Sequence, residues 1–91
     1  MSMVTMLGEL ASTYWKTYIN YLKSKRGDRN WIRNNLSWLK KVARFGRRAL
    51  RSLNDEALYP FFEAVRENTE LRKLLASECM KVVLHYRLST G

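Results

Sequence analysis

The chain has 91 residues, 17 Lys and Arg against 8 Asp and Glu, a net charge of +9, and 46% hydrophobic residues. This length allows one small domain, placed over residues 1–91, and the apolar content excludes a disordered tail. One cysteine and one histidine exclude an intramolecular disulfide and a Cys/His zinc cage within one chain, and four glycines with one proline argue against an all-β fold.

The first predicted element is a helix over residues 3–26. Large apolar side chains recur there every three or four residues, so they would line one helical face: Met3, Met6, Leu7, Leu10, Tyr14, Tyr18, Tyr21 and Leu22. Gly27 supplies a C-terminal stop, and Asp28 is a suitable N-cap for the next helix.

The second predicted helix covers residues 29–52 and is strongly two-sided. At 100° per residue, its apolar residues share a sector of about 120°: Trp31, Ile32, Trp38, Leu39, Val42, Ala49, Leu50 and Leu53. Six basic residues share a sector of about 60° on the opposite side: Arg29, Arg33, Lys40, Arg44, Arg47 and Arg51. This spacing fits a helix and cannot occupy one face of a strand.

Two further helices are predicted in the C-terminal part. Asn54 would cap the first of them, and Pro60 predicts either a kink within it or a start near Pro60. The last helix is expected over about 70–88, with Asn68 or Thr69 as its cap.

The predicted fold class is therefore all-α. The simplest architecture is a long antiparallel hairpin of helices over about 3–26 and 29–52, packed with two shorter C-terminal helices. The two long helices carry more apolar surface than one chain is expected to bury, and a homodimer would bury the rest. This prediction depends only on that excess of apolar area.

Charge is segregated along the sequence. The stretch 16–51 holds twelve basic residues and one aspartate, whereas 52–91 holds five basic and six acidic residues. Ordinary solvated helix faces mix Glu with Lys, but no acidic residue other than Asp28 lies between Leu10 and Asp55. The pattern indicates an anion-binding surface. The predicted nucleic-acid-binding residues are Arg29, Arg33, Lys40, Lys41, Arg44, Arg47, Arg48 and Arg51.

Catalytic chemistry is not indicated. The sequence has no Gly-rich phosphate loop and no nucleophile with a base nearby, and Cys79 and His85 do not share a helical face. We therefore predict no enzyme activity, no catalytic residues, no metal site and no cofactor.

The function predicted from the basic face is non-enzymatic, largely sequence-independent binding to the phosphate backbone of a nucleic-acid duplex. RNA is slightly favoured over DNA because duplex RNA is recognised mainly by shape and backbone. The alternative is a helical protein–protein interaction module or adaptor, regulatory or host-directed, that docks through the second helix or residues 50–62. An acidic protein partner or an anionic membrane surface would suit the same charge.

The predicted location is intracellular, either cytoplasmic or nuclear. Uninterrupted apolar runs reach only three residues, so no transmembrane segment is expected. Residues 1–10 carry Glu9 and no Lys or Arg, which does not fit a secretory signal.

Overall fold

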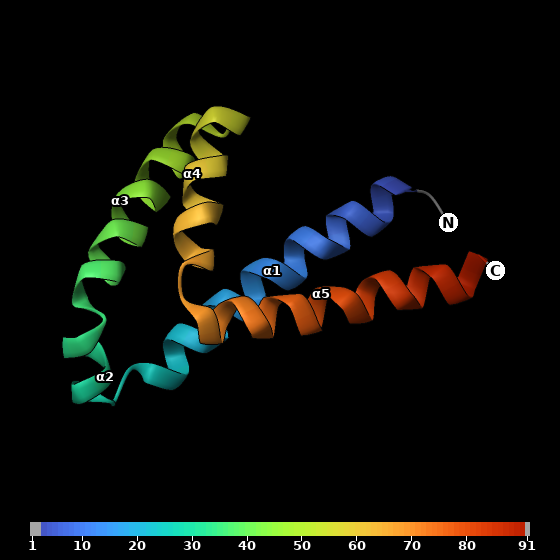
Figure 1. The fold of residues 1–91 in the computed structure, drawn as a ribbon. Helices are drawn as coiled ribbons and strands as arrows, with labels where there is room; N and C mark the ends of the chain where they lie inside the picture. Colours follow the sequence, from blue (N-terminus) through green and yellow to red (C-terminus); the bar gives the residue numbers. More distant parts are fainter. Residues whose placement is uncertain (1–2, 91) are drawn as a thin grey trace.

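The computed structural model describes residues 3–90, and these form helices joined by short turns (Figure 1). The helices are α1 (Met3–Lys25), α2 (Arg29–Asn34), α3 (Leu36–Ser52), α4 (Asp55–Arg66) and α5 (Thr69–Thr90). The described residues contain no strand. The predicted all-α class is confirmed.

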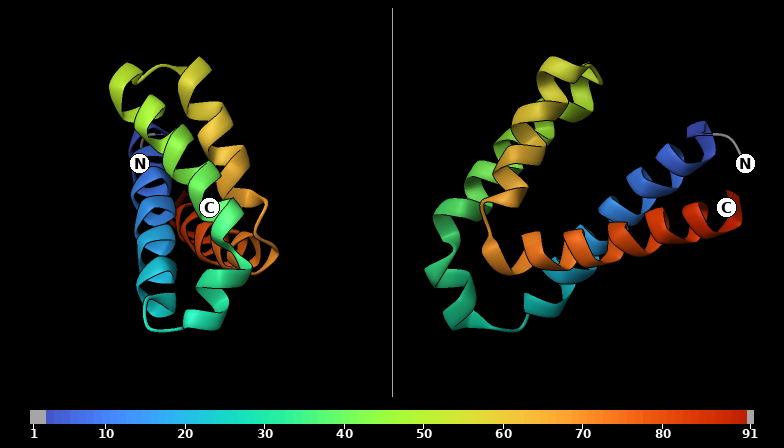
Figure 2. Two further views of the ribbon diagram at one scale, coloured as in Figure 1. Left: turned by 90° about the vertical axis from the view of Figure 1, so that its left-hand side faces the viewer. Right: turned by 45° about the vertical axis from the view of Figure 1, so that its right-hand side comes forward.

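The helices are arranged as two antiparallel pairs that diverge as the arms of a V (Figure 2). We call α1 with α5 the terminal arm, because it brings the two ends of the chain together, and α3 with α4 the central arm. The short helix α2 lies between α1 and α3. The turn from α4 to α5 at residues 67–68 provides the second connection between the arms.

The pairing of helices differs from the predicted long hairpin. The packing of α1 with the C-terminal helices is confirmed, and its neighbour along most of its length is α5, which is nearly as long. Because the buried face of α3, with Val42 and Ala49, packs against α4, α3 is not available to lie along α1. The hairpin partners are therefore α3 and α4, and this part of the prediction is wrong.

The predicted continuous helix over 29–52 is interrupted at Asn35. This residue has φ −116° and ψ 15°, and its backbone N–H donates to both Trp31 O and Ile32 O. Its side-chain Nδ2 also donates to Trp31 O at 2.8 Å, which ends α2 one residue before α3 begins. Asparagine commonly competes in this way for local backbone groups.

Several helix ends are set by side chains that the sequence identified. Asp28 Oδ1 accepts from Trp31 N at 3.0 Å, and Asn54 Oδ1 accepts from Ala57 N at 2.9 Å. Asn68 Oδ1 likewise accepts from Leu71 N at 3.0 Å at the start of α5. Pro60 lies within α4, so the reading in which a helix starts near Pro60 is wrong.

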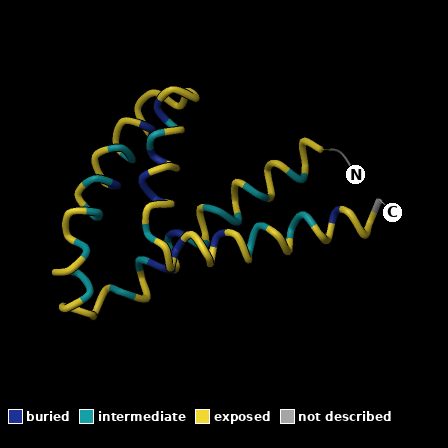
Figure 3. Tube along the Cα trace, in the orientation of Figure 1, coloured by how far each residue is buried: buried dark blue, intermediate teal, exposed yellow. Residues whose placement is uncertain are grey.

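The hydrophobic core lies near the vertex of the V, where the two arms meet. Figure 3 shows buried positions concentrated along α4 and at the beginning of α5, whereas the far ends of the helices are mainly exposed. The core cluster draws on four helices: Tyr18, Tyr21, Val42, Ala49, Phe61, Ala64, Val65, Leu71 and Leu75. The arms are therefore held together at one end and separate towards the other.

Candidate nucleic-acid interface

The outward face of α3 carries the central part of the predicted basic surface. Lys40, Arg44, Arg47 and Arg51 are exposed and share one side of the helix, opposite the buried Val42 and Ala49. From Lys40 to Arg51 the helix rises about 16 Å at 1.5 Å per residue. The packing of α4 against the apolar side is what directs these four cations to solvent.

Most of the predicted site residues have no acidic partner. Lys41 is half-buried at the edge of the face, and its Nζ lies 2.6 Å from Glu67 Oε1. Among the described residues, no carboxylate lies within 4.0 Å of the other seven predicted cations. Arg48 is exposed beside the main row, and the Arg44 guanidinium lies 5.1 Å from the centre of the Phe45 ring. The face therefore keeps its positive charge unneutralised.

The two cations of α2 do not continue the row. Arg29 and Arg33 are exposed, but the interruption at Asn35 separates their helix from α3. The predicted continuous helix over 29–52 would have carried its six cations along about 33 Å at 1.5 Å per residue. That continuity is wrong, and about half of this length remains on α3. Four cations over about 16 Å can still meet successive phosphates, but not a full duplex turn of about 34 Å.

The tryptophans of this region, Trp31 and Trp38, are half-buried and pack against other parts of the protein. The rings of Trp31 and Trp38 meet edge to face at 6.2 Å, and Trp31 meets Tyr21 in the same way at 5.8 Å. The indole Nε1 of Trp38 donates to the carbonyl oxygen of Ala64. Both rings are engaged in contacts within the protein, so we assign them no role in base stacking, and the α3 surface offers mainly charge.

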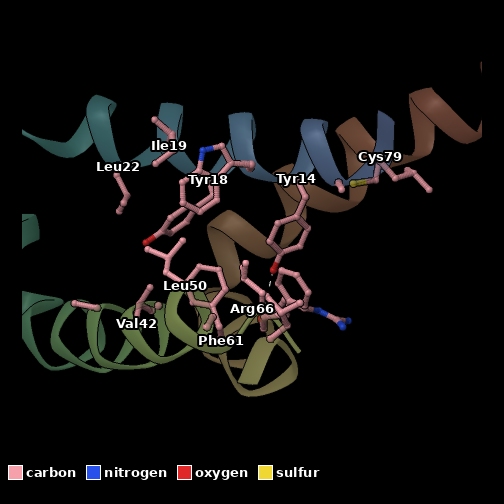
Figure 4. A pocket seen from close by; sticks show the side chains of 18 of the residues that line it. Tyr14, Tyr18, Ile19, Leu22, Val42, Leu50, Phe61, Arg66 and Cys79 are labelled. Atoms are coloured by element: carbon pink, nitrogen blue, oxygen red, sulfur yellow. Dashed lines mark hydrogen bonds between the residues drawn. The ribbon is translucent and has the colours of Figure 1, made fainter. Parts of the chain in front are cut away.

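A second feature, which the sequence did not predict, is an apolar groove of about 980 Å³ between α1 and the central arm (Figure 4). Apolar side chains of α1 form one wall and those of α3 and α4 the other, while Cys79 of α5 lies at one end. Leu50 and Leu53 belong to the apolar sector of the predicted second helix but are 68% and 73% exposed, because they face the open groove. The one indication in the sequence was the number of apolar residues on the two long predicted helices, which exceeds what one chain is expected to bury.

Burial favours the neutral forms of tyrosine and cysteine side chains that line the groove. The Tyr14 hydroxyl donates to Phe62 O at 3.4 Å, and burial raises the pKa of Tyr14 to about 12, although the charge of Arg66 acts in the opposite direction. Burial also raises the pKa of the Cys79 thiol. The charged residues that line the groove are both arginines, Arg47 and Arg66.

Comparisons with protein-family models, with curated protein sequences and with solved structures find no match to this chain. Within the described residues, no helix combines the length and apolar character needed to cross a membrane. The same part of the chain contains no group of three or more His, Cys, Asp or Glu side chains arranged to hold a metal ion. The function must therefore be argued from the basic face and the groove.

Proposed function

We propose that this protein is a non-enzymatic nucleic-acid-binding protein that contacts the phosphate backbone of a duplex through α3. The observation that carries the proposal is the row of four exposed cations, Lys40, Arg44, Arg47 and Arg51, without a neighbouring carboxylate. Like charges three and four residues apart repel one another, and a row of phosphates would remove that repulsion.

The composition of the row favours phosphate over other anions. Three of the four cations are arginines, whose planar guanidinium groups can donate two hydrogen bonds to one phosphate. Residues 36–52 include no Asn, Gln, Asp or Glu, so the adenine and cytosine contacts that those side chains make are absent from α3. Recognition would therefore depend mainly on backbone shape and charge. This favours duplex RNA slightly over duplex DNA.

The test is a binding titration with labelled duplex RNA, duplex DNA and single strands of matched length at several salt concentrations. Four to five phosphate contacts per chain should give a slope of log K against log salt of roughly −3 to −5. A slope near zero, or equal affinity for an uncharged polymer, would contradict the proposal.

A pair of matched variants locates the contact. Arg44→Ala with Arg51→Ala removes two outward cations that do not line the groove and should weaken duplex binding at least tenfold. Arg72→Ala with Lys73→Ala removes the same charge from an exposed part of α5 and should change affinity by less than about threefold. Equal losses in both variants would show that net charge, and not the α3 face, determines binding.

A further inference from the structure

We propose that the groove between the two arms is a docking site for an amphipathic helix of a partner protein. The partner helix would place an apolar stripe in the groove and acidic side chains along its edges. This inference concerns a different surface from the nucleic-acid interface, and it does not depend on that interface being correct.

The walls of the groove present apolar side chains that no part of the described chain covers. Leu50 and Leu53 are mostly exposed on the central arm, and Trp15 of α1, which also lines the groove, is 48% exposed. Figure 4 shows side chains of α1 and of the central arm directed towards the same space. Side chains spaced three, four and seven residues apart on one helix could fill a groove of this volume.

The charges around the groove determine which kind of helix fits. Arg47 and Arg66 line it, and no acidic residue does. Beyond the α3 edge lie further exposed cations, among them Arg44 and Arg51. The Glu63 carboxylate lies 3.7 Å from the Arg66 guanidinium but does not line the groove. A helix with flanking Glu or Asp would meet opposite charge along the central arm, whereas a helix with flanking Lys or Arg would be repelled there.

The same electrostatic reasoning disfavours a second copy of this chain as the occupant. Each copy carries a net charge of +9, concentrated over residues 16–51. The acidic residues of the described chain lie mainly on α4 and α5, where Glu67 and Glu70 already pair with Lys41 and Lys25. Bringing a second such chain into the groove would add cations to an edge that is already basic.

The experiment uses the complete protein and three designed probe peptides of about 16 residues. The first has leucines at one helical stripe flanked by glutamates, the second has lysines in place of the glutamates, and the third has the composition of the first in scrambled order. Fluorescence anisotropy should show saturable binding of the acidic peptide, at least tenfold tighter than either of the others. Binding of the acidic and basic peptides within threefold of each other, or no saturable binding of the acidic peptide, would overturn the proposal.

Two pairs of variants place the bound peptide. Leu50→Ser with Leu53→Ser should weaken binding of the acidic peptide at least tenfold while leaving the circular dichroism spectrum unchanged, because both side chains are already exposed. Leu36→Ser with Leu74→Ser alters two exposed leucines outside the groove and should leave the affinity within about twofold. An equal loss in both pairs would overturn the assignment of the groove.

Two further measurements distinguish a partner helix from the other possible occupants of the groove. Cys79 lines the groove and is the single cysteine, so bound acidic peptide should slow its alkylation by iodoacetamide at least fivefold. Sedimentation equilibrium should show a monomer whose mass is unchanged by Leu50→Ser with Leu53→Ser. If the protein is a dimer and the Leu50→Ser, Leu53→Ser variant is a monomer, the occupant of the groove is a second copy of the chain. If the same variant loses duplex RNA affinity tenfold, the groove binds nucleic acid. Either result overturns the proposal.

Discussion

The indole Nε1 of Trp38 donates a hydrogen bond of 2.7 Å to the carbonyl oxygen of Ala64 and so joins α3 to the last turn of α4. Carbonyl groups in the last turn of a helix lack partners within that helix. Ala64 O also accepts from Glu67 N, but at the longer distance of 3.3 Å. The central arm is therefore held by a directed polar bond as well as by apolar packing.

Trp38→Phe tests this bond because it keeps an aromatic ring but removes the donor. We expect the free energy of unfolding to fall by about 1–2 kcal/mol, since the carbonyl keeps only its weaker partner. Urea denaturation followed by circular dichroism measures this change. Trp15→Phe, at a half-exposed ring, should change stability by less than about 0.5 kcal/mol and serves as the control.

Asn68, in the turn between α4 and α5, joins the start of α5 to α1 through its side chain. Its Oδ1 accepts from Leu71 N and also from the hydroxyl of Tyr21, which lies 3.3 Å away on α1. Asn68→Ala should lower the melting temperature, at a cost of about 1–2 kcal/mol, whereas Asn68→Asp should retain most of the stability because a carboxylate also caps helices. Identical melting temperatures for the alanine variant and the unmodified protein would show that this cap is dispensable.

A leucine-to-alanine substitution should cost more stability in the core near the vertex than in the groove. Leu71 is fully buried, and Leu71→Ala is expected to cost about 2–5 kcal/mol through lost burial and a cavity. Leu50→Ala should cost less than about 0.5 kcal/mol because the side chain is mainly in solvent. Thermal melting of both variants compares the two sites, and similar losses would mean that Leu50 is covered in solution.

The interruption at Asn35 leads to a prediction about affinity. Because Arg29 and Arg33 lie on α2, apart from the row on α3, Arg29→Ala with Arg33→Ala should weaken duplex RNA binding by less than about threefold. Arg44→Ala with Arg51→Ala should weaken it at least tenfold. A larger effect of the α2 pair in the same titration would indicate that both helices follow one duplex.

Tyr14 makes stability depend on pH in the alkaline range. Its pKa is raised to about 12 in the folded protein by burial, against 10.0 for an ordinary tyrosine, so the folded state retains a proton that the unfolded chain releases. The contribution is complete below pH 10 and is lost as pH rises towards 12. Tyr14→Phe should therefore lose stability less steeply over this interval, as measured by urea denaturation at successive pH values. Parallel curves for the two proteins would exclude this role.

Local structure was predictable where a single side chain determines it. Asp28 and Asn54 cap helices as expected, because an Asx side chain that accepts from a first-turn N–H acts within three residues. The end of α2 at Asn35 was not predictable from pattern alone, since the apolar and basic periodicity continues across it and neither glycine nor proline marks it. The pairing of α1 with α5 depends on contacts between segments that are far apart in the sequence, Met3–Lys25 and Thr69–Thr90, which periodicity does not encode.

The two candidate surfaces also differ in how far the sequence alone predicts them. The outward direction of Lys40, Arg44 and Arg51 follows from helical spacing and from the burial of Val42 opposite them, so the sequence was sufficient. The groove was not predictable, because the exposure of Leu50 depends on how the two arms diverge. A hydrophobic residue on the apolar side of a helix is covered only if another element reaches it.

The pairing of the first helix with the last also determines the order in which the protein can assemble. The central arm joins neighbouring segments, and contacts between neighbouring segments form quickly. On the ribosome, α1 emerges first but cannot acquire its main packing partner until Thr69–Thr90 has been synthesised. The side of α1 that packs against α5 therefore lacks its partner until then, and the terminal arm closes last.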